Sequence, residues 1–162
     1  MVLWLSVTGC HRTGTYHGIE IVGSNRFATQ IRLALNIIRT KSPDDFLLIS
    51  KHVTRIEECE RSGMDIRRST CQLAPRTAYY SLTWCAASIA HEAHHGKLGC
   101  CASYSYGHAH EERACIDYQR AILERIGAPA WEIEYLATLD GNHFDTDGDG
   151  KYTWKDYKRR NW

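Results

Sequence analysis

The chain lacks two features that would place it in a membrane or on a nucleic acid. None of its apolar runs approaches the ~20 residues that a membrane-spanning helix needs, so no such span is expected. Lys and Arg (20) nearly balance Asp and Glu (19), and the resulting net charge of +1 excludes a bulk attraction to nucleic acid or anionic lipid. The 162 residues, 43% of them hydrophobic, fit one domain with a core, with room for a small appendage.

The seven cysteines are an odd number, so they cannot all pair within one chain. Residues 7–10, Val-Thr-Gly-Cys, offer an explanation because they resemble a bacterial lipobox, in which Cys10 becomes the lipidated first residue. The segment departs from that motif, since Val replaces the usual Leu, no basic residue precedes it and the apolar stretch is short. An ordinary apolar N-terminal strand with a free thiol is the alternative to a lipid anchor at Cys10.

The six other cysteines could form three disulfides in an oxidising compartment. The most local candidate pair is Cys59 with Cys71, which would close a turn around Gly63. This pattern favours a secreted or cell-envelope protein, and the alternative is a cytoplasmic protein with buried thiols. The six residues are Cys59, Cys71, Cys85, Cys100, Cys101 and Cys115.

Residues 91–95 read His-Glu-Ala-His-His, an H-E-x-x-H pattern that follows the uncharged segment 82–90. Residues four apart lie on one face of a helix, so His91 and His95 can bind the same metal ion. Glu92 is rotated by one position and can instead reach a metal-bound water as a general base. The spacing is that of zinc-dependent peptidases, although so short a pattern also recurs by chance. Gly96 is expected to end this helix.

A catalytic zinc normally has three protein ligands, so a third ligand is needed. The longer metzincin pattern fails, because Cys101 stands where its third His would fall and Leu98 where its Gly would fall. In the other large class of these peptidases, a Glu on the following helix completes the site. That helix is expected over residues 111–126, with Gly127 ending it, and it offers Glu111 and Glu112.

Both glutamates have a small residue one turn later, as close helix packing requires. The apolar face of the helix lies slightly closer to Glu111. Glu112 shares one stripe with Cys115 and Gln119, which resembles the third-ligand helix of small gluzincin-like proteins, and this resemblance favours Glu112 narrowly. A solvated acid at a helix N-terminus is the alternative for either residue. His108 and Tyr106, in the loop before this helix, are candidate outer-shell or oxyanion-binding groups.

Residues 145–156 match the twelve-residue EF-hand loop, which binds Ca²⁺ through oxygen atoms. Gly150 stands at position 6, where the chain must turn sharply. A single loop without a partner indicates a structural calcium site, and an Asp-rich turn without metal is the alternative. The predicted ligands at positions 1, 3, 5, 7 and 12 are Asp145, Asp147, Asp149, the Lys151 carbonyl and Asp156.

The remaining segments predict an α+β fold, mostly helical with a small antiparallel sheet. Segments 16–22, 53–56 and 66–73 are expected as strands. Helices are expected after Ser24, from Pro43 to Ile49, and from Pro129 to Leu139. The first of these has an apolar stripe, which predicts a core face. The stripe comprises Phe27, Ile31, Ala34, Leu35 and Ile38.

The chain resembles the minimal gluzincin-like zinc metallopeptidases in two expected helices, the one that carries the H-E-x-x-H pattern and the one that carries Glu111 and Glu112. The resemblance covers about residues 16–140, between a possible signal or lipobox remnant at 1–15 and the calcium loop and tail at 141–162. It implies a zincin-like fold and a peptide or protein substrate. It further implies that His91, His95 and Glu112 or Glu111 bind Zn²⁺ and that Glu92 is the general base.

Two other functions fit the same residues. The first is a non-catalytic cell-envelope binding protein that keeps a zincin scaffold for a stabilising metal. It would have four protein ligands, including Cys100 or His108, and no open position. The second is a calcium-binding interaction domain in which the H-E-x-x-H pattern is accidental.

Overall fold

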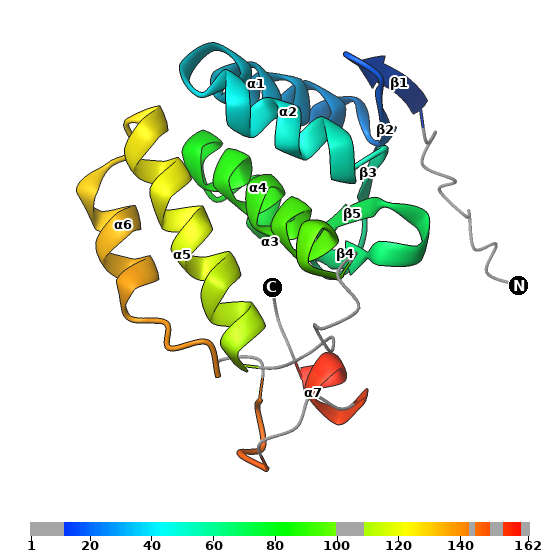
Figure 1. Cartoon of the computed structure of the whole chain (residues 1–162). Helices are drawn as coiled ribbons and strands as arrows, with labels where there is room; N and C mark the ends of the chain where they lie inside the picture. The colour runs from blue at the N-terminus through cyan, green and yellow to red at the C-terminus, as the bar shows by residue number, and fades with distance from the viewer. Residues whose placement is uncertain (1–11, 100–108, 143–144, 150–153, 160–162) are drawn as a thin grey trace, which may run out of the picture.

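The protein, described here from a computed structural model, packs helices against one face of a small sheet (Figure 1). The structure describes residues 12–99, 109–142, 145–149 and 154–159. None of the described helices is long and apolar enough to cross a membrane. The strands are β1 (Arg12–Tyr16), β2 (Ile19–Gly23), β3 (Arg55–Glu58), β4 (Gly63–Asp65) and β5 (Thr70–Leu73). The helices are α1 (Asn25–Lys41), α2 (Pro43–His52), the 3-10 helix η1 (Ile66–Arg68), α3 (Pro75–Ala78), α4 (Leu82–Gly99), α5 (Ala109–Ile126), α6 (Ala130–Ala137) and α7 (Trp154–Arg159).

The sheet is mixed, with the strand order β1-β2-β3-β5-β4. The α+β class is as predicted, but the expectation of an antiparallel sheet is wrong at its centre, where β2 and β5 both pair in parallel with β3. The helices α1 and α2 return the chain along the sheet between β2 and β3, so β3 runs in the same direction as β2. Only the two outer pairs, β1–β2 and β4–β5, are antiparallel.

The segment predicted as a single strand over 16–22 is instead part of a β-hairpin, with the end of β1 at Tyr16, a two-residue turn, and most of β2. His17 and Gly18 have φ angles of 46° and 88°, which are the left-handed conformations that a two-residue hairpin turn requires. Tyr16 is therefore paired with Ile19 across the turn. Strand β1 begins at Arg12, so the expected boundary between residues 15 and 16 falls inside a strand; residues 7–10, with Cys10, lie outside the described part of the chain.

The expected disulfide between Cys59 and Cys71 is absent, and both thiols are free. Cys71 is paired with Ile56, three residues before Cys59, and successive residues of a strand point to opposite faces of a sheet. An offset of three therefore directs the two side chains to different faces. Cys85 and Cys115 are also free, so these four residues give no support to an oxidising compartment.

Helix α1 forms as its sequence predicts. The Ser24 hydroxyl accepts a hydrogen bond from the Phe27 backbone N–H at 3.2 Å and so caps the first turn. All five residues of the predicted apolar stripe are buried. Helix α2 begins at Pro43 as expected, but it continues to His52, three residues beyond the predicted end at Ile49. The helix predicted after Pro129 is α6, which ends at Ala137.

Helix α4 passes through the centre of the molecule between α1, α2, α5 and the sheet (Figure 1). Its alanines are buried on several sides, so neighbouring backbones can approach closely. The prediction that Gly96 ends this helix is wrong, because α4 continues to Gly99. Gly96 serves packing instead: a Cβ there would lie 3.1 Å from Met64 Cε of β4 and 3.3 Å from His52 Cβ of α2.

A buried carboxylate joins α2 to α5. Asp45 accepts hydrogen bonds from Tyr118 Oη at 2.8 Å and from Arg125 Nη1 at 2.6 Å, and Ser42 Oγ donates a third. Burial alone would raise the pKa of Asp45, but the three hydrogen bonds and the Arg125 charge together hold that pKa below its ordinary value. This cluster holds α5 at a fixed position along α2.

Replacing Asp45 by Asn should lower the free energy of unfolding at pH 7 by about 1–2 kcal/mol. This loss is at the lower end of what hydrogen bonds to a charged group contribute, because Arg125 is half exposed and solvent weakens its interaction with Asp45. Since the folded pKa is depressed, the contribution is present above the unfolded pKa of about 3.9 and is lost as the pH falls below it. Urea unfolding of D45N and the wild type at several pH values measures this. D44N, which changes an exposed neighbour, should lower the free energy of unfolding by less. If D45N and the wild type differed in this free energy by the same amount down to pH 2, the assignment would be contradicted.

Candidate metal centre

The packing of α4 against α5 brings three predicted ligands together. Nε2 of His91 and Nε2 of His95 are 3.1 Å apart. The Glu112 carboxylate lies across both rings, with one oxygen 3.3 Å from His91 Nε2 and the other 3.1 Å from His95 Nε2. All three side chains are largely buried, with exposed fractions of 12%, 13% and 16%.

These spacings fit a single zinc ion. Zinc lies about 2.0–2.2 Å from imidazole nitrogens and carboxylate oxygens, and its ligands are arranged tetrahedrally, so neighbouring ligand atoms should be roughly 3.3 Å apart. The two Nε2 atoms are 3.1 Å apart, and each lies 3.3 or 3.1 Å from a different oxygen of the Glu112 carboxylate. The side chains of His91, His95 and Glu112 therefore have the donor types and the separations of a three-ligand zinc site.

The neighbouring acid, Glu111, occupies a different place. Its side chain is 1% exposed, and its Oε1 lies 3.1 Å from Nδ1 of His95, the ring nitrogen on the other side from Glu112. Metal-binding histidines usually donate this second N–H to a carboxylate or carbonyl, which fixes the ring orientation and the tautomer. The geometry thus separates the two acids, with Glu112 at the ligand atoms and Glu111 behind His95.

The groups around His95 favour a positive charge on its ring. Burial alone would lower the pKa of His95, but hydrogen bonds with Cys115, Glu111 and Glu112 raise it well above its ordinary value. Negative and polar groups are therefore already arranged around a position that a cation can occupy. A metal ion would replace the proton, so metal binding at this site should weaken as the pH falls.

Cys115 is part of this cluster, although the sequence pointed to it only as a small residue on the Glu112 stripe. It is fully buried and shares a hydrogen bond with His95. The ligand atoms of His91, His95 and Cys115 all lie within 4.8 Å of one another. Burial, with smaller effects from Glu112 and Glu92, raises the pKa of the thiol to about 11.

Glu92, the predicted general base, is buried and has an exposed fraction of 8%. Its carboxylate acts electrostatically on Cys71 of β5 and Cys115 of α5, where it contributes to the raised pKa of both thiols. Glu92 is therefore close enough to both thiols to act on them, and it follows His91 directly on α4.

Two ring nitrogens and one carboxylate oxygen around this centre are buried without a hydrogen-bond partner among the described residues. They are His91 Nδ1, His94 Nδ1 and Glu111 Oε2. Burial lowers the pKa of His94 to about 4, so this ring is neutral at neutral pH, and it packs edge-on against Tyr118 with the ring centroids 4.5 Å apart. His108 and Tyr106 lie outside the described residues, as do Cys100 and Cys101.

The predicted calcium loop is described in part. Carboxylate oxygens of Asp145, Asp147 and Asp156 lie within 4.8 Å of one another. Asp145 Oδ1 accepts backbone N–H bonds from Gly148 at 2.7 Å and Asp149 at 3.2 Å, which folds the loop back on its first ligand position. Lys151 lies outside the described residues.

Asp156, at the last position of the loop, is fully buried. One of its oxygens accepts hydrogen bonds from both the backbone N–H and the hydroxyl of Thr146, each at 3.0 Å. These bonds connect the end of the loop to its second residue and keep Asp156 close to Asp145 and Asp147, three of the five positions predicted to bind calcium.

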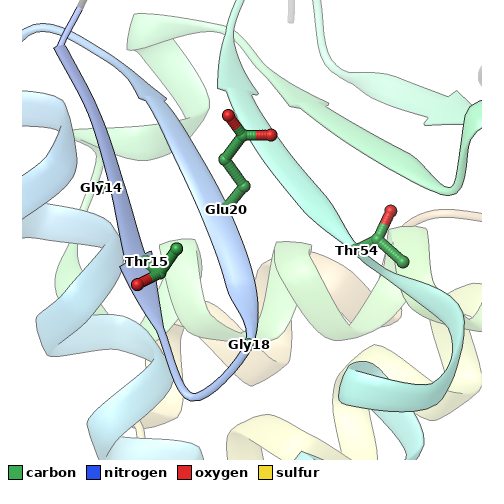
Figure 2. Close-up of a pocket in the computed structure, with 5 residues that line it drawn as sticks. All are labelled: Gly14, Thr15, Gly18, Glu20 and Thr54. Atoms are coloured by element: carbon green, nitrogen blue, oxygen red, sulfur yellow. The ribbon is translucent and has the colours of Figure 1, made fainter.

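A hollow of about 550 Å³ lies at the β1–β2 hairpin, and none of the predicted metal-binding residues lines it (Figure 2). Its lining offers a single carboxylate and two hydroxyl groups, without a nitrogen or sulfur ligand. It therefore lacks the donors of the centre between α4 and α5. The lining residues are Gly14, Thr15, Gly18, Glu20 and Thr54.

The chain matches no known family model, no curated protein and no solved structure.

Proposed function

We propose that the protein is a zinc-dependent hydrolase of peptide bonds. The observation that carries the proposal is the convergence of His91 Nε2, His95 Nε2 and the Glu112 carboxylate at 3.1–3.3 Å, beside a buried glutamate at the second position of the H-E-x-x-H pattern. Three protein ligands leave one tetrahedral position for water, as catalytic zinc sites require. The proposal agrees with the resemblance to gluzincin-like peptidases.

The roles of the side chains follow from their positions. Bound zinc would supply a Lewis acid that lowers the pKa of its water to about 7. Glu92 would take up the proton of the attacking water and deliver it to the leaving amine. His91, His95 and Glu112 would hold the ion, and Glu111 would orient the His95 ring through Nδ1.

Strand β4 stands at one end of the described strand order, and it packs against α4 close to Gly96, one residue past His95. This end of the sheet therefore lies near the proposed metal ligands of α4, and we propose that the substrate backbone runs past it.

The zinc and hydrolysis claims are tested with H91A and E92Q. H91A should lose stoichiometric zinc, measured by elemental analysis after removal of loosely bound metal, because two ligands hold the ion poorly. E92Q should keep its zinc but lose about 10²–10⁴-fold in the rate of peptide or casein cleavage, since only the proton acceptor is removed. Full zinc occupancy of the wild type without any peptide turnover would contradict the catalytic role.

The neighbouring acids provide a matched pair of variants. E112Q should abolish tight zinc binding. E111Q should weaken it by only about 10–100-fold, because the amide oxygen of Gln can still accept the His95 N–H. A competition assay with a chromogenic chelator measures both affinities. If E111Q lost more zinc affinity than E112Q, the two roles would be exchanged and Glu111 would be the ligand.

A second function is favoured by one observation, the position of Cys115 beside both histidines. A thiolate at this distance could join His91, His95 and Glu112 as a fourth ligand, which would fill the open position and make the metal structural. The protein would then be a metal-stabilised binding module, as the cell-envelope alternative requires.

Cobalt substitution distinguishes the two functions. If the site is open, the Co²⁺ protein should lack a thiolate-to-metal charge-transfer band, and C115S should bind metal as the wild type does. A charge-transfer band that C115S removes, together with an inactive zinc protein, would favour the closed site and the binding function.

We further propose that residues 145–156 bind Ca²⁺ in a structural role. The support is the EF-hand pattern together with the convergence of Asp145, Asp147 and Asp156. Calcium would neutralise three carboxylates that otherwise repel one another, and it would connect the loop to the start of α7.

Calcium at 1 mM should stabilise the protein by about 1–1.5 kcal/mol if the affinity is near 10⁻⁴ M, a value typical of weak extracellular sites. Thermal unfolding with and without calcium measures this. D145N should abolish the effect, whereas D117N, which changes a half-exposed acid on α5, should retain it. The assignment fails if calcium leaves the melting temperature of the wild type unchanged.

A further inference from the structure

The chain after α6 returns to the first turn of α5, the turn that carries Glu112 (Figure 1). Arg113 Nη1, in the same turn, donates a hydrogen bond to the Leu139 carbonyl at 3.2 Å. Gly141 lies so close to this turn that a Cβ there would be 2.7 Å from one of its carbonyl oxygens and 3.2 Å from the Arg113 backbone nitrogen. Residues 139–142 therefore pack directly against the turn that bears the proposed zinc ligand.

The same segment leads into the calcium loop. Asn142 donates its backbone N–H to Asp140 Oδ1 at 2.8 Å, and its carbonyl accepts the Asp145 N–H at 2.9 Å. Asp145 carries the first carboxylate of the acidic group that it forms with Asp147 and Asp156. The first position of this group is thus connected, through a short hydrogen-bonded turn, to the start of α5.

The other end of the loop is attached to the sheet. Asp156 lies in α7, and two residues later the Lys158 carbonyl accepts a hydrogen bond from Arg61 Nη2 at 3.0 Å. Arg61 belongs to the connection between β3 and β4. Ser62 fixes this connection, because its buried hydroxyl donates to Thr77 Oγ1 at 2.8 Å and accepts a backbone N–H at 3.1 Å.

The two attachments lead to the two elements next to the proposed zinc ligands. The first turn of α5 carries Glu112, and β4 begins two residues after Arg61 and packs against α4 at Gly96. An ion that held Asp145 and Asp156 together would therefore connect the start of α5 to the end of the sheet beside α4. Without an ion, carboxylates whose oxygens lie within 4.8 Å of one another repel, which weakens this connection.

We propose that calcium binding to Asp145, Asp147 and Asp156 strengthens zinc binding between α4 and α5. The inference rests on the proposed zinc and calcium sites and adds a coupling between them. Calcium restricts the first turn of α5 to the position in which Glu112 faces the two histidines, so less conformational entropy is lost when zinc binds. The coupling is reciprocal, and zinc raises the calcium affinity by the same factor.

The coupling would make the proposed hydrolase responsive to its surroundings. A calcium site with an affinity of about 10⁻⁴ M is filled at ~1 mM calcium and empty at ~1 µM. Zinc would therefore be held tightly in a calcium-rich medium and more weakly in a calcium-poor one.

Zinc affinity in the presence and absence of calcium tests the proposal. A competition assay with a chromogenic chelator, calibrated in each buffer, should give a zinc dissociation constant at least about fivefold lower in calcium than in an equal concentration of magnesium. Magnesium is the control ion because it demands a near-ideal octahedral site. D145N, which removes one carboxylate of the acidic group, should show the same zinc affinity in both buffers.

R61A separates the coupling from the two metal sites. It removes the attachment of α7 to the sheet but no proposed ligand, so its zinc affinity in magnesium should equal that of the wild type and calcium should no longer raise it. R159A removes an exposed arginine from α7, leaves the bond between Arg61 and Lys158 in place, and should keep the calcium effect. G141A breaks the other attachment, because a Cβ there meets the start of α5, and it provides a second test should R61A fail to fold.

Hydrogen exchange and peptide turnover complete the experiment. In the zinc-free protein, calcium should slow the exchange of amides in the first two turns of α5, and this slowing should be absent in D145N and R61A. A zinc affinity that calcium does not change overturns the coupling even if the protein cleaves peptides. So does a full calcium effect that persists in both R61A and G141A. A calcium-dependent zinc affinity without peptide turnover supports the coupling and contradicts the hydrolase.

Discussion

The contact between α4 and α5 is the interaction on which the centre of this molecule depends. Helix α4 supplies His91 and His95 one turn apart, but two imidazoles alone hold a metal weakly and leave its third position undefined. The position comes from α5, which carries Glu112 to within 3.1–3.3 Å of both rings. A rotation of α5 by one residue, about 100°, would exchange Glu112 for Glu111. The packing of the two helices thus decides which acid faces the histidines.

The same contact makes the chemistry of the site sensitive to small residues. Alanines along α4 and the absence of a side chain at Gly96 allow α2 and β4 to approach it closely. The close approach buries Glu92 and both histidines, and burial strengthens the electrostatic interactions among them. Packing and chemistry at this centre are consequently two results of one arrangement of helices.

Much of the helical part could be predicted from the sequence because its signals are local. Ser24 caps α1, Pro43 begins α2, and Gly127 follows the last residue of α5, with a φ angle of 72°. The H-E-x-x-H spacing likewise places His91 and His95 on one face without knowledge of the rest. These predictions needed only helical periodicity and capping chemistry.

The features that could not be predicted depend on contacts between distant segments. The parallel pairing of β2 with β3 follows from the course of α1 and α2, and no pattern within the strands specifies it. Gly96 looks like a helix terminator in sequence and is a packing residue in space. To predict the hydrogen bond between Cys115 and His95, one would need to know how their two helices are rotated relative to each other. Only the hairpin turn at His17 and Gly18 left a local signal that the prediction missed.

The bond between Asp45 and Arg125 connects the metal centre to the rest of the fold in a further way. It fastens α5, the helix that carries Glu112, to α2, which in turn packs against α4. An ion bound between α4 and α5, as proposed, would therefore favour the folded arrangement of all three helices together, and the stabilisation would grow with the logarithm of the ion concentration above the dissociation constant. The α2 amides would then gain protection from hydrogen exchange when the ion binds, although α2 contributes no atom to the proposed ligand cluster.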